Sequence, residues 1–142
     1  MFESAELGHK IDKASYRTAI PGLRSALLDA QFEVRENGTF PVVILIAGIN
    51  ESDKSATVNT LYEWMDPRYL STLAPATPTD EERDRPHMWR YWRALPPKGR
   101  IGILSASWYF DPIRARIEED PLAFDQRIDQ INRFEAMLVN EG

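Results

Sequence analysis

Residues 41–55 read PVVILIAGINESDKS, an apolar run that leads directly into a sequence close to a phosphate-binding loop. The continuous branched and apolar residues at 42–47 predict a strand covered on both faces, as in a parallel sheet. A phosphate-binding loop, or P-loop, has a glycine, four further residues and then Gly-Lys-Ser/Thr. The positions that match this register are Gly48, Lys54 and Ser55. Asp53 stands where the second glycine is expected, so the stretch predicts a P-loop architecture with one departure.

Asp53 bears on function because a P-loop holds phosphate with successive backbone N–H groups at a helix N-terminus. A residue at this place must tolerate unusual backbone angles and lie close to the anion. Aspartate adopts left-handed angles more readily than most residues. Its carboxylate would nevertheless repel a phosphate group a few ångströms away. We therefore expect nucleotide chemistry to be weakened or lost.

The length and composition indicate one soluble domain. Hydrophobic residues make up 43% of the 142 residues, which is enough for a core. The net charge of −5 argues against a general nucleic-acid binder, so no nucleic-acid partner is expected. The apolar run is too short to span a bilayer, and the opening residues MFESAE lack the features of a signal peptide. With no cysteine for disulfides or thiolate ligands, we expect a cytoplasmic protein without membrane contact.

Apolar positions spaced three to four residues apart predict helices, and short apolar runs predict strands. The predicted helices cover about 13–36, 54–65, 80–95 and 124–138. The pair Asn37-Gly38 is expected to end the first, and Thr79 or Asp80 to cap the start of the third. The predicted strands cover 42–47, 71–74 and 100–104. We expect Pro21 to start or kink the first helix and Pro86 to divide or bend the third. Strands that alternate with helices predict an α/β layer fold with right-handed crossovers, in a single domain over residues 1–142.

A basic stretch stands out against the acidic chain. Its cations are Arg83, Arg85, Arg90, Arg93, Lys98 and Arg100. Such a run is as often a solvated face with ion pairs as a binding surface. We take the phosphate-binding candidates to be Gly48, Lys54, Ser55, Arg90 and Arg93. His9 and His87 have no second ligand at metal spacing, so they predict neither catalysis nor a metal site.

The tryptophans of this region, and one that follows it, have two interpretations. They are Trp89, Trp92 and Trp108. Each could serve as a stacking platform for a base, but core or interface packing is the commoner use of such residues.

The near-P-loop and several later motifs, in this order, resemble the polyphosphate kinase 2 family. The later motifs are DPR at 66–68, PTDEER at 78–83, WRYWR at 89–93, LPPKG at 95–99 and SWY at 107–109. The opening MFESAE and the block WRYWRALPP more narrowly resemble the N-terminal domain of two-domain members, the polyphosphate:AMP phosphotransferases. The resemblance covers essentially the whole chain. It implies a P-loop kinase-like three-layer fold and phosphoryl transfer between polyphosphate and AMP, ADP or ATP, with Mg²⁺.

The resemblance also implies where chemistry is lost. In active members the loop reads Gly-x-Asp-x-x-Gly-Lys-Gly or close to it, and a later strand ends in Phe-Asp-Arg-Ser-Trp-Tyr. That Asp helps to hold magnesium and that Arg faces phosphate, but here Ser105 and Ala106 occupy the two positions. An Arg at the transferring group can be worth roughly 1,000-fold in rate. The family-equivalent positions, none of which we expect to be catalytic, are Asp53, Lys54, Ser105 and Ala106.

The resemblance leaves the metal question open at three residues. Glu51 and Asp111 are the nearby acids that could replace the missing magnesium ligand. Ser55 fits a helix cap as well as a metal ligand. We predict no metal site, and we expect magnesium binding to be weak if it occurs.

Three hypotheses for function follow. The first is a non-catalytic domain of a polyphosphate:AMP phosphotransferase, serving assembly or weak phosphate binding beside a catalytic polyphosphate kinase 2 domain in the same chain or assembly. The second is an active polyphosphate-dependent nucleotide kinase with a non-standard P-loop, and the third is a phosphate-sensing module. The chain stops where the family continues into a further strand and a lid, so we expect a fold truncated at its C-terminus. A homo-oligomer is compatible with each hypothesis.

Overall fold

The structure is a computed structural model that describes residues 10–47, 51–74, 77–117 and 121–141. Gly48 and His9 lie outside the described residues. Within them, a three-stranded parallel sheet occupies the centre of the fold. The strands are β1 (Val42–Leu45), β2 (Leu70–Leu73) and β3 (Ile101–Leu104), in the order β1-β3-β2.

The middle strand is the most enclosed part of the molecule. All four residues of β3 are buried, and Ile101 lies in register with Val42 on one side and Leu70 on the other. Gly102 faces Pro96 so closely that a Cβ atom at this glycine would lie 2.9 Å from the proline Cδ atom. The sequence therefore requires a residue without a side chain at this point of β3.

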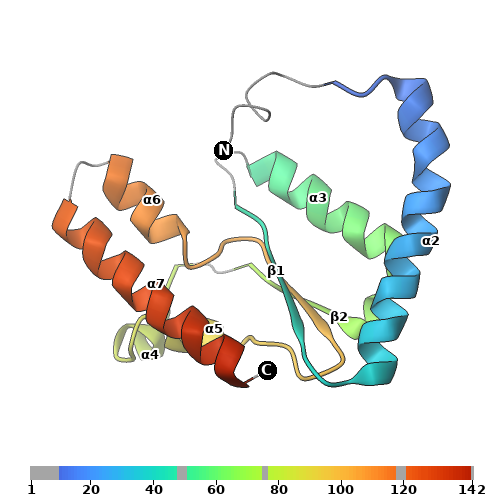
Figure 1. Cartoon of the computed structure of the whole chain (residues 1–142). Helices are drawn as coiled ribbons and strands as arrows, with labels where there is room; N and C mark the ends of the chain where they lie inside the picture. Colours follow the sequence, from blue (N-terminus) through green and yellow to red (C-terminus); the bar gives the residue numbers. More distant parts are fainter. Residues whose placement is uncertain (1–9, 48–50, 75–76, 118–120, 142) are drawn as a thin grey trace.

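Helices cover both faces of the sheet (Figure 1). On one face lie α2 (Lys13–Asn37) and α3 (Glu51–Trp64). On the other lie α5 (Trp89–Trp92) and α7 (Pro121–Glu141), with α6 (Phe110–Ile117) packed along α7 and α4 (Asp80–Arg83) preceding α5. The predicted three-layer α/β fold with a parallel sheet is confirmed.

Two buried clusters join the layers. The cluster on the α2 and α3 face consists of Met65, Leu70, Ile101 and Ile103. The cluster on the α5 and α7 face consists of Tyr91, Leu104, Trp108, Ile131 and Phe134. Val42 packs against the first cluster and Val43 against the second, because successive strand residues point to opposite faces.

Local capping chemistry sets the ends of the helices. The Asp12 carboxylate accepts hydrogen bonds from the backbone N–H groups of Ala14 and Ser15 at the start of α2. The Ser15 hydroxyl and these N–H groups lower the pKa of Asp12. Gly38 ends α2 with a left-handed φ of 53°, as the Asn37-Gly38 pair predicts. Thr79 and Glu82 form a capping box at α4, which confirms Thr79 as a helix start.

Some predicted elements differ from those observed. The third helix is two four-residue helices separated around Pro86, which confirms that this proline divides it. Pro21 lies inside α2 and does not begin it. The helix predicted from residue 54 already begins at Glu51, and α6 was not predicted.

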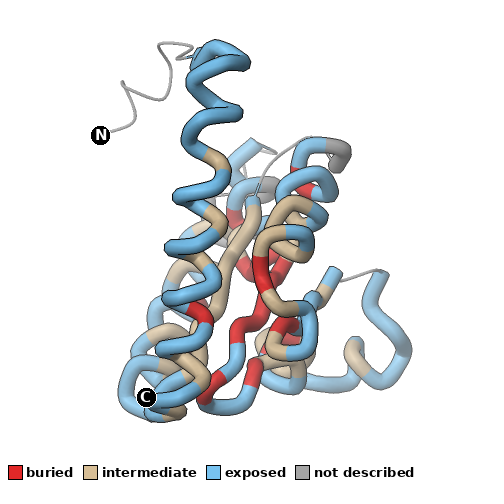
Figure 2. Tube along the Cα trace, turned by 90° about the vertical axis from the view of Figure 1, so that its right-hand side faces the viewer, coloured by how far each residue is buried: buried red, intermediate tan, exposed pale blue. Residues whose placement is uncertain are grey.

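The apolar face predicted for α2 is only partly buried. Ile20, Leu27 and Val34 are half-buried, whereas Tyr16, Leu23 and Ala30 are exposed. The N-terminal half of α2 projects past the rest of the described fold, which leaves Tyr16 and Leu23 exposed (Figure 2). Ala30 is exposed as well, although it lies in the second half of the helix. The helix is not a candidate for the bilayer: in the described ranges, no helix has both the length and the apolar character needed to cross a membrane.

Candidate functional site

A cavity of about 160 Å³ lies where β2 and β3 end beside the first turns of α3. Its lining residues are Lys54, Ser55, Val58, Asn59, Thr72, Ala74 and Ser105. In α/β folds, ligands bind in the crevice outside the carboxyl ends of parallel strands. The cavity therefore occupies the place at which this architecture holds a ligand.

Lys54 brings the positive charge of this cavity. It is 5% exposed and lies in the first turns of α3, where the helix dipole also favours an anion. Ser55, also predicted as a phosphate-binding residue, lines the same cavity. The structure thus brings Lys54 and Ser55 together as predicted, while their role in binding stays a prediction.

Ser105 closes the cavity from the β3 side. Its backbone N–H donates to the Leu73 carbonyl oxygen at 3.0 Å, which extends the pairing of β2 with β3 by one residue. Ala106 is half-buried and is not among the lining residues. The resemblance implies a lost charged group at both Ser105 and Ala106. Of these two, Ser105 lines the cavity that contains Lys54.

The donors and acceptors of the cavity suit an oxyanion better than a magnesium ion. Among the described residues, its lining offers an ammonium group, hydroxyls and an amide, and no carboxylate. Magnesium prefers carboxylate and phosphate oxygens, and an ammonium group repels it. In the part of the chain that the structure describes, no three His, Cys, Asp or Glu residues come together to hold a metal ion. The described residues do not fit a magnesium site, and the side chains of Glu51 and Asp111 lie outside the description.

Asp53 differs from the expectation for a loop residue. It lies inside α3, its backbone carbonyl oxygen accepts a hydrogen bond from the Thr57 hydroxyl at 2.9 Å, and its side chain is exposed. It does not line the Lys54 cavity. Asp53 therefore has a helical conformation here, and its carboxylate can affect a bound anion only from the helix surface.

The loop after β3 is fixed by a residue that the sequence analysis missed. Glu135 of α7 accepts hydrogen bonds at one oxygen, Oε1, from the Trp108 indole N–H at 2.9 Å and from the Tyr109 hydroxyl at 2.5 Å. Trp108 is only 3% exposed and makes edge-to-face contacts with Tyr91 and Phe134. The prediction that Trp108 is a packing residue is confirmed.

We call the two hydrogen bonds from Trp108 and Tyr109 to Glu135 the Glu135 clamp. This clamp changes the acidity of the Tyr109 phenol. The hydrogen bond to Glu135 and burial raise the pKa of Tyr109, because both favour the neutral phenol. The sequence places Glu135 on the predicted last helix, directly after the apolar residue Phe134, and this position is the one signal for Glu135. Nothing in the sequence identifies its donors, which lie 26 and 27 residues away.

Arg90 and Arg93 lie away from the cavity that contains Lys54. They are carried by α5 and the residue after it, on the opposite face of the sheet from α3, and neither lines the cavity. Arg90 is largely buried and pairs with Glu82 at 3.6 Å. The Arg93 guanidinium lies 4.7 Å from the centre of the half-buried Trp89 ring.

Two other members of the basic stretch, Lys98 and Arg100, also lie away from the cavity. Lys98 and Arg100 precede β3, whereas Ser105 follows it, so these cations lie at the opposite edge of the sheet from the Lys54 cavity. The basic stretch is therefore not one surface. His87 contacts Tyr91 edge-on at 6.0 Å between ring centres, and Trp92 is 45% exposed.

Comparison with known proteins identifies the family. The family model described as polyphosphate kinase 2 matches residues 10–142. The chain belongs to the polyphosphate kinase 2 family. It is 51% identical over 144 aligned residues to a polyphosphate:AMP phosphotransferase of Pseudomonas aeruginosa, and 44% identical to one of Pseudomonas syringae pv. tomato. Each alignment covers 100% of this chain but 29% of the relative, so the chain spans under a third of the length of these two relatives.

Solved structures of this family have the same fold. A structure described as a polyphosphate kinase 2 from Pseudomonas aeruginosa superposes with a TM-score of 0.90 at 51% identity, covering 100% of this chain and 31% of that one. A polyphosphate kinase 2 from Arthrobacter aurescens superposes with a TM-score of 0.82 at 24% identity, covering 96% of this chain and 50% of that one. The P-loop kinase-like fold implied by the resemblance is thus confirmed for this chain.

Proposed function

We propose that this chain is a phosphate-contacting but non-catalytic domain of a polyphosphate:AMP phosphotransferase. The observation that carries the proposal is the cavity lined by both Lys54 and Ser105, in which the described residues include hydroxyl and amide groups but no carboxylate. The lysine and hydroxyl groups can donate to phosphate oxygens. The proposed ligand is polyphosphate or the phosphates of AMP, ADP or ATP; the relatives' names include polyphosphate, AMP and ADP.

The same cavity supports the loss of turnover. Phosphoryl transfer depends on positioned charges that neutralise the transferring group, usually metal ions with an arginine or lysine. Lys54 supplies one such charge, but Ser105 has no charge to hold a metal. Arg90 and Arg93 do not line the cavity. The domain is therefore proposed to hold phosphate, or to support a catalytic partner domain, without transferring it.

Two measurements on the purified chain test the proposal. With magnesium, long-chain polyphosphate and AMP or ADP, no nucleotide product is expected under conditions in which a complete family enzyme turns over. Product formation at a comparable rate, abolished by Lys54→Ala, would overturn the non-catalytic assignment.

The second measurement is a calorimetric titration with tripolyphosphate. Lys54→Ala should weaken binding about tenfold, as expected for loss of a hydrogen bond to a charged group. Lys13→Ala, which removes an exposed lysine of α2, is the matched control and should leave affinity within about twofold. Equal affinities for the wild type and Lys54→Ala would contradict phosphate contact in the cavity.

A further inference from the structure

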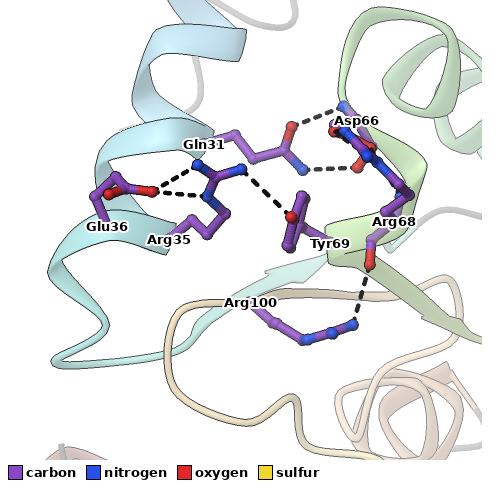
Figure 3. Close-up of polar contacts among 7 residues, drawn as sticks. All are labelled: Gln31, Arg35, Glu36, Asp66, Arg68, Tyr69 and Arg100. Atoms are coloured by element: carbon purple, nitrogen blue, oxygen red, sulfur yellow. Dashed lines mark hydrogen bonds and ion pairs between the residues drawn. The ribbon is translucent and has the colours of Figure 1, made fainter.

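Three arginines from separate segments converge on the ring of Tyr69 (Figure 3). Arg35 comes from the last turn of α2, Arg68 from the short 3-10 helix η1 (Pro67–Tyr69), and Arg100 from the residue before β3. Their guanidinium carbons lie 5.0, 5.7 and 5.7 Å from the ring centre. An electron-rich ring face attracts cations at such distances, so Tyr69 holds the three charges near one another.

Each guanidinium is held in place by hydrogen bonds. Arg35 binds the neighbouring Glu36 carboxylate and donates to the Tyr69 hydroxyl at 3.3 Å. Arg68 donates to the Asp66 carboxylate through Nε and Nη2, and Arg100 donates from Nη1 to the Arg68 carbonyl oxygen at 3.0 Å. The arginines are thus ordered before any ligand arrives, which lowers the entropy cost of binding.

The segment that carries Arg68 and Tyr69 is itself held in place by hydrogen bonds to α2. The buried side chain of Gln31 donates to the Asp66 carbonyl oxygen at 3.0 Å and accepts from the Asp66 backbone N–H at 2.7 Å. This pair of bonds ties α2 to the start of η1. The Arg68 guanidinium lowers the pKa of Asp66, so the carboxylate that holds Arg68 stays ionised at neutral pH.

The cluster has more N–H donors and more positive charges than the carboxylates that pair with its arginines can satisfy. Its three arginines face two carboxylates, those of Glu36 and Asp66, and Arg100 pairs with neither of them nor with any other carboxylate in the described ranges. A guanidinium carries five N–H donors, and the hydrogen bonds described above use one nitrogen of Arg100 and two nitrogens of Arg68. The Arg68 side chain is 76% exposed, so a ligand can reach it from solvent.

A neighbouring carboxylate limits where an anion could lie. Asp29 lines the cavity of about 200 Å³ on the α2 side of this cluster, together with Phe32 and Arg35. Its negative charge disfavours an anion inside that cavity. The favourable position is therefore on the side of Arg68 and Arg100.

We propose that Arg68 and Arg100, supported by Arg35, form a second oxyanion site that binds a phosphate group of a polyphosphate chain. Arginine suits this ligand because its planar donors match phosphate oxygens in pairs. The ligand class rests on the proposed function, but the residues are different. Arg100 and Ser105 flank the four-residue β3 at its opposite ends, so five residue steps separate them by roughly 16 Å at the usual rise per residue. One phosphate group cannot touch both sites, so they bind independently or hold separate groups of one long chain.

The test is calorimetric titration of the full chain with tripolyphosphate. The double variant Arg68→Gln/Arg100→Gln should weaken binding about tenfold or more at low salt, because it removes two charged donors. The control Arg17→Gln/Arg133→Gln makes the same change in net charge at two exposed arginines elsewhere on α2 and α7. It should change affinity by about twofold at most, since separated surface charges are screened. Equal losses in the two double variants would overturn the site and indicate general attraction to positive charge.

A second measurement needs no variant and guards against misfolding of the first. Phenylglyoxal modifies accessible arginines, and mass spectrometry locates the products. In the wild type, tripolyphosphate should protect Arg68 and Arg100 but not Arg17 or Arg133. Equal modification with and without tripolyphosphate at all four arginines would overturn the inference.

The two proposals fail in different ways. If Lys54→Ala abolishes all binding while the Arg68/Arg100 double variant binds like the wild type, the second site is wrong and the proposed function stands. If the double variant abolishes binding and Lys54→Ala has no effect, the second site stands and phosphate contact at Lys54 is wrong.

Discussion

The clamp at Glu135 gives a prediction whose size follows from burial. Glu135→Ala removes the acceptor of the Trp108 indole N–H and of the Tyr109 hydroxyl. Trp108 is 3% exposed, so its N–H cannot turn to water, and an unpaired buried donor costs about 1–3 kcal/mol. Tyr109 is half-buried and can recover a water partner, which keeps its loss near 1 kcal/mol at most. We expect a loss of about 2–3 kcal/mol in the free energy of unfolding.

Urea unfolding followed by tryptophan fluorescence measures this loss. At a typical slope of about 2 kcal/mol per molar urea, the midpoint should fall by about 1 M. Glu135→Gln is the matched control because it keeps an acceptor oxygen in the same place and loses only the charge. Its midpoint should fall by less than half as much. A midpoint for Glu135→Ala within about 0.2 M of the wild type would refute the account of the clamp.

The clamp also predicts a dependence on pH with a definite sign. The pKa of Tyr109 is raised in the folded state by the hydrogen bond to Glu135 and by burial. The stabilisation from this phenol is therefore fully present below the ordinary tyrosine pKa of about 10 and is lost as the pH rises through the raised pKa. Above about pH 10, the wild type should lose stability more steeply than Glu135→Gln. Parallel stability curves for the two proteins would contradict this assignment.

Three further substitutions test other parts of the structure. Gln31→Leu leaves the backbone N–H and C=O of Asp66 without their partner and should lower the urea midpoint by about 1 M, whereas a change below about 0.3 M would show that water replaces the amide. Asp53→Gly and Asp53→Ala both remove a negative charge near the start of α3, so each should tighten tripolyphosphate binding about two- to fivefold in calorimetry without restoring turnover. A gain in Asp53→Gly alone would indicate a backbone effect. Gly102→Ala places a methyl group against Pro96 and should cost about 1–3 kcal/mol in urea unfolding, while an unchanged midpoint would show that the proline segment shifts freely.

The fold was predictable where the sequence carries strong local signals. The apolar run at 42–47 and the cap signals at Gly38 and Thr79 gave elements that the structure confirms. The segment around 80–95 shows the limit of this method. Its apolar spacing continues across Pro86, but the structure places two short helices there with a turn between them. Periodicity reports which residues could share a face and not whether the backbone between them is continuous.

The sequence predicted those residues of the candidate site that belong to a motif with fixed spacing. The spacing from the P-loop pattern identified Lys54, and the SWY motif located Ser105, so both cavity residues were found from sequence. Arg90 and Arg93 were grouped with Lys54 because of charge alone, but they lie in the other layer of the fold. Closeness in sequence does not determine which face of a sheet a residue reaches, since each crossover can change the layer.

The contacts that hold the loop after β3 are separate from the groups that would perform chemistry there. Glu135 of α7 accepts the hydrogen bonds of Trp108 and Tyr109, whereas Ser105 lines the cavity beside α3. Loss of a charged residue at the cavity therefore costs little packing, because the neighbouring aromatic residues keep their partners. Removal of Glu135 would instead leave a buried donor unpaired and damage the fold. A fold of this kind can therefore lose a charged group at the cavity and still keep its architecture.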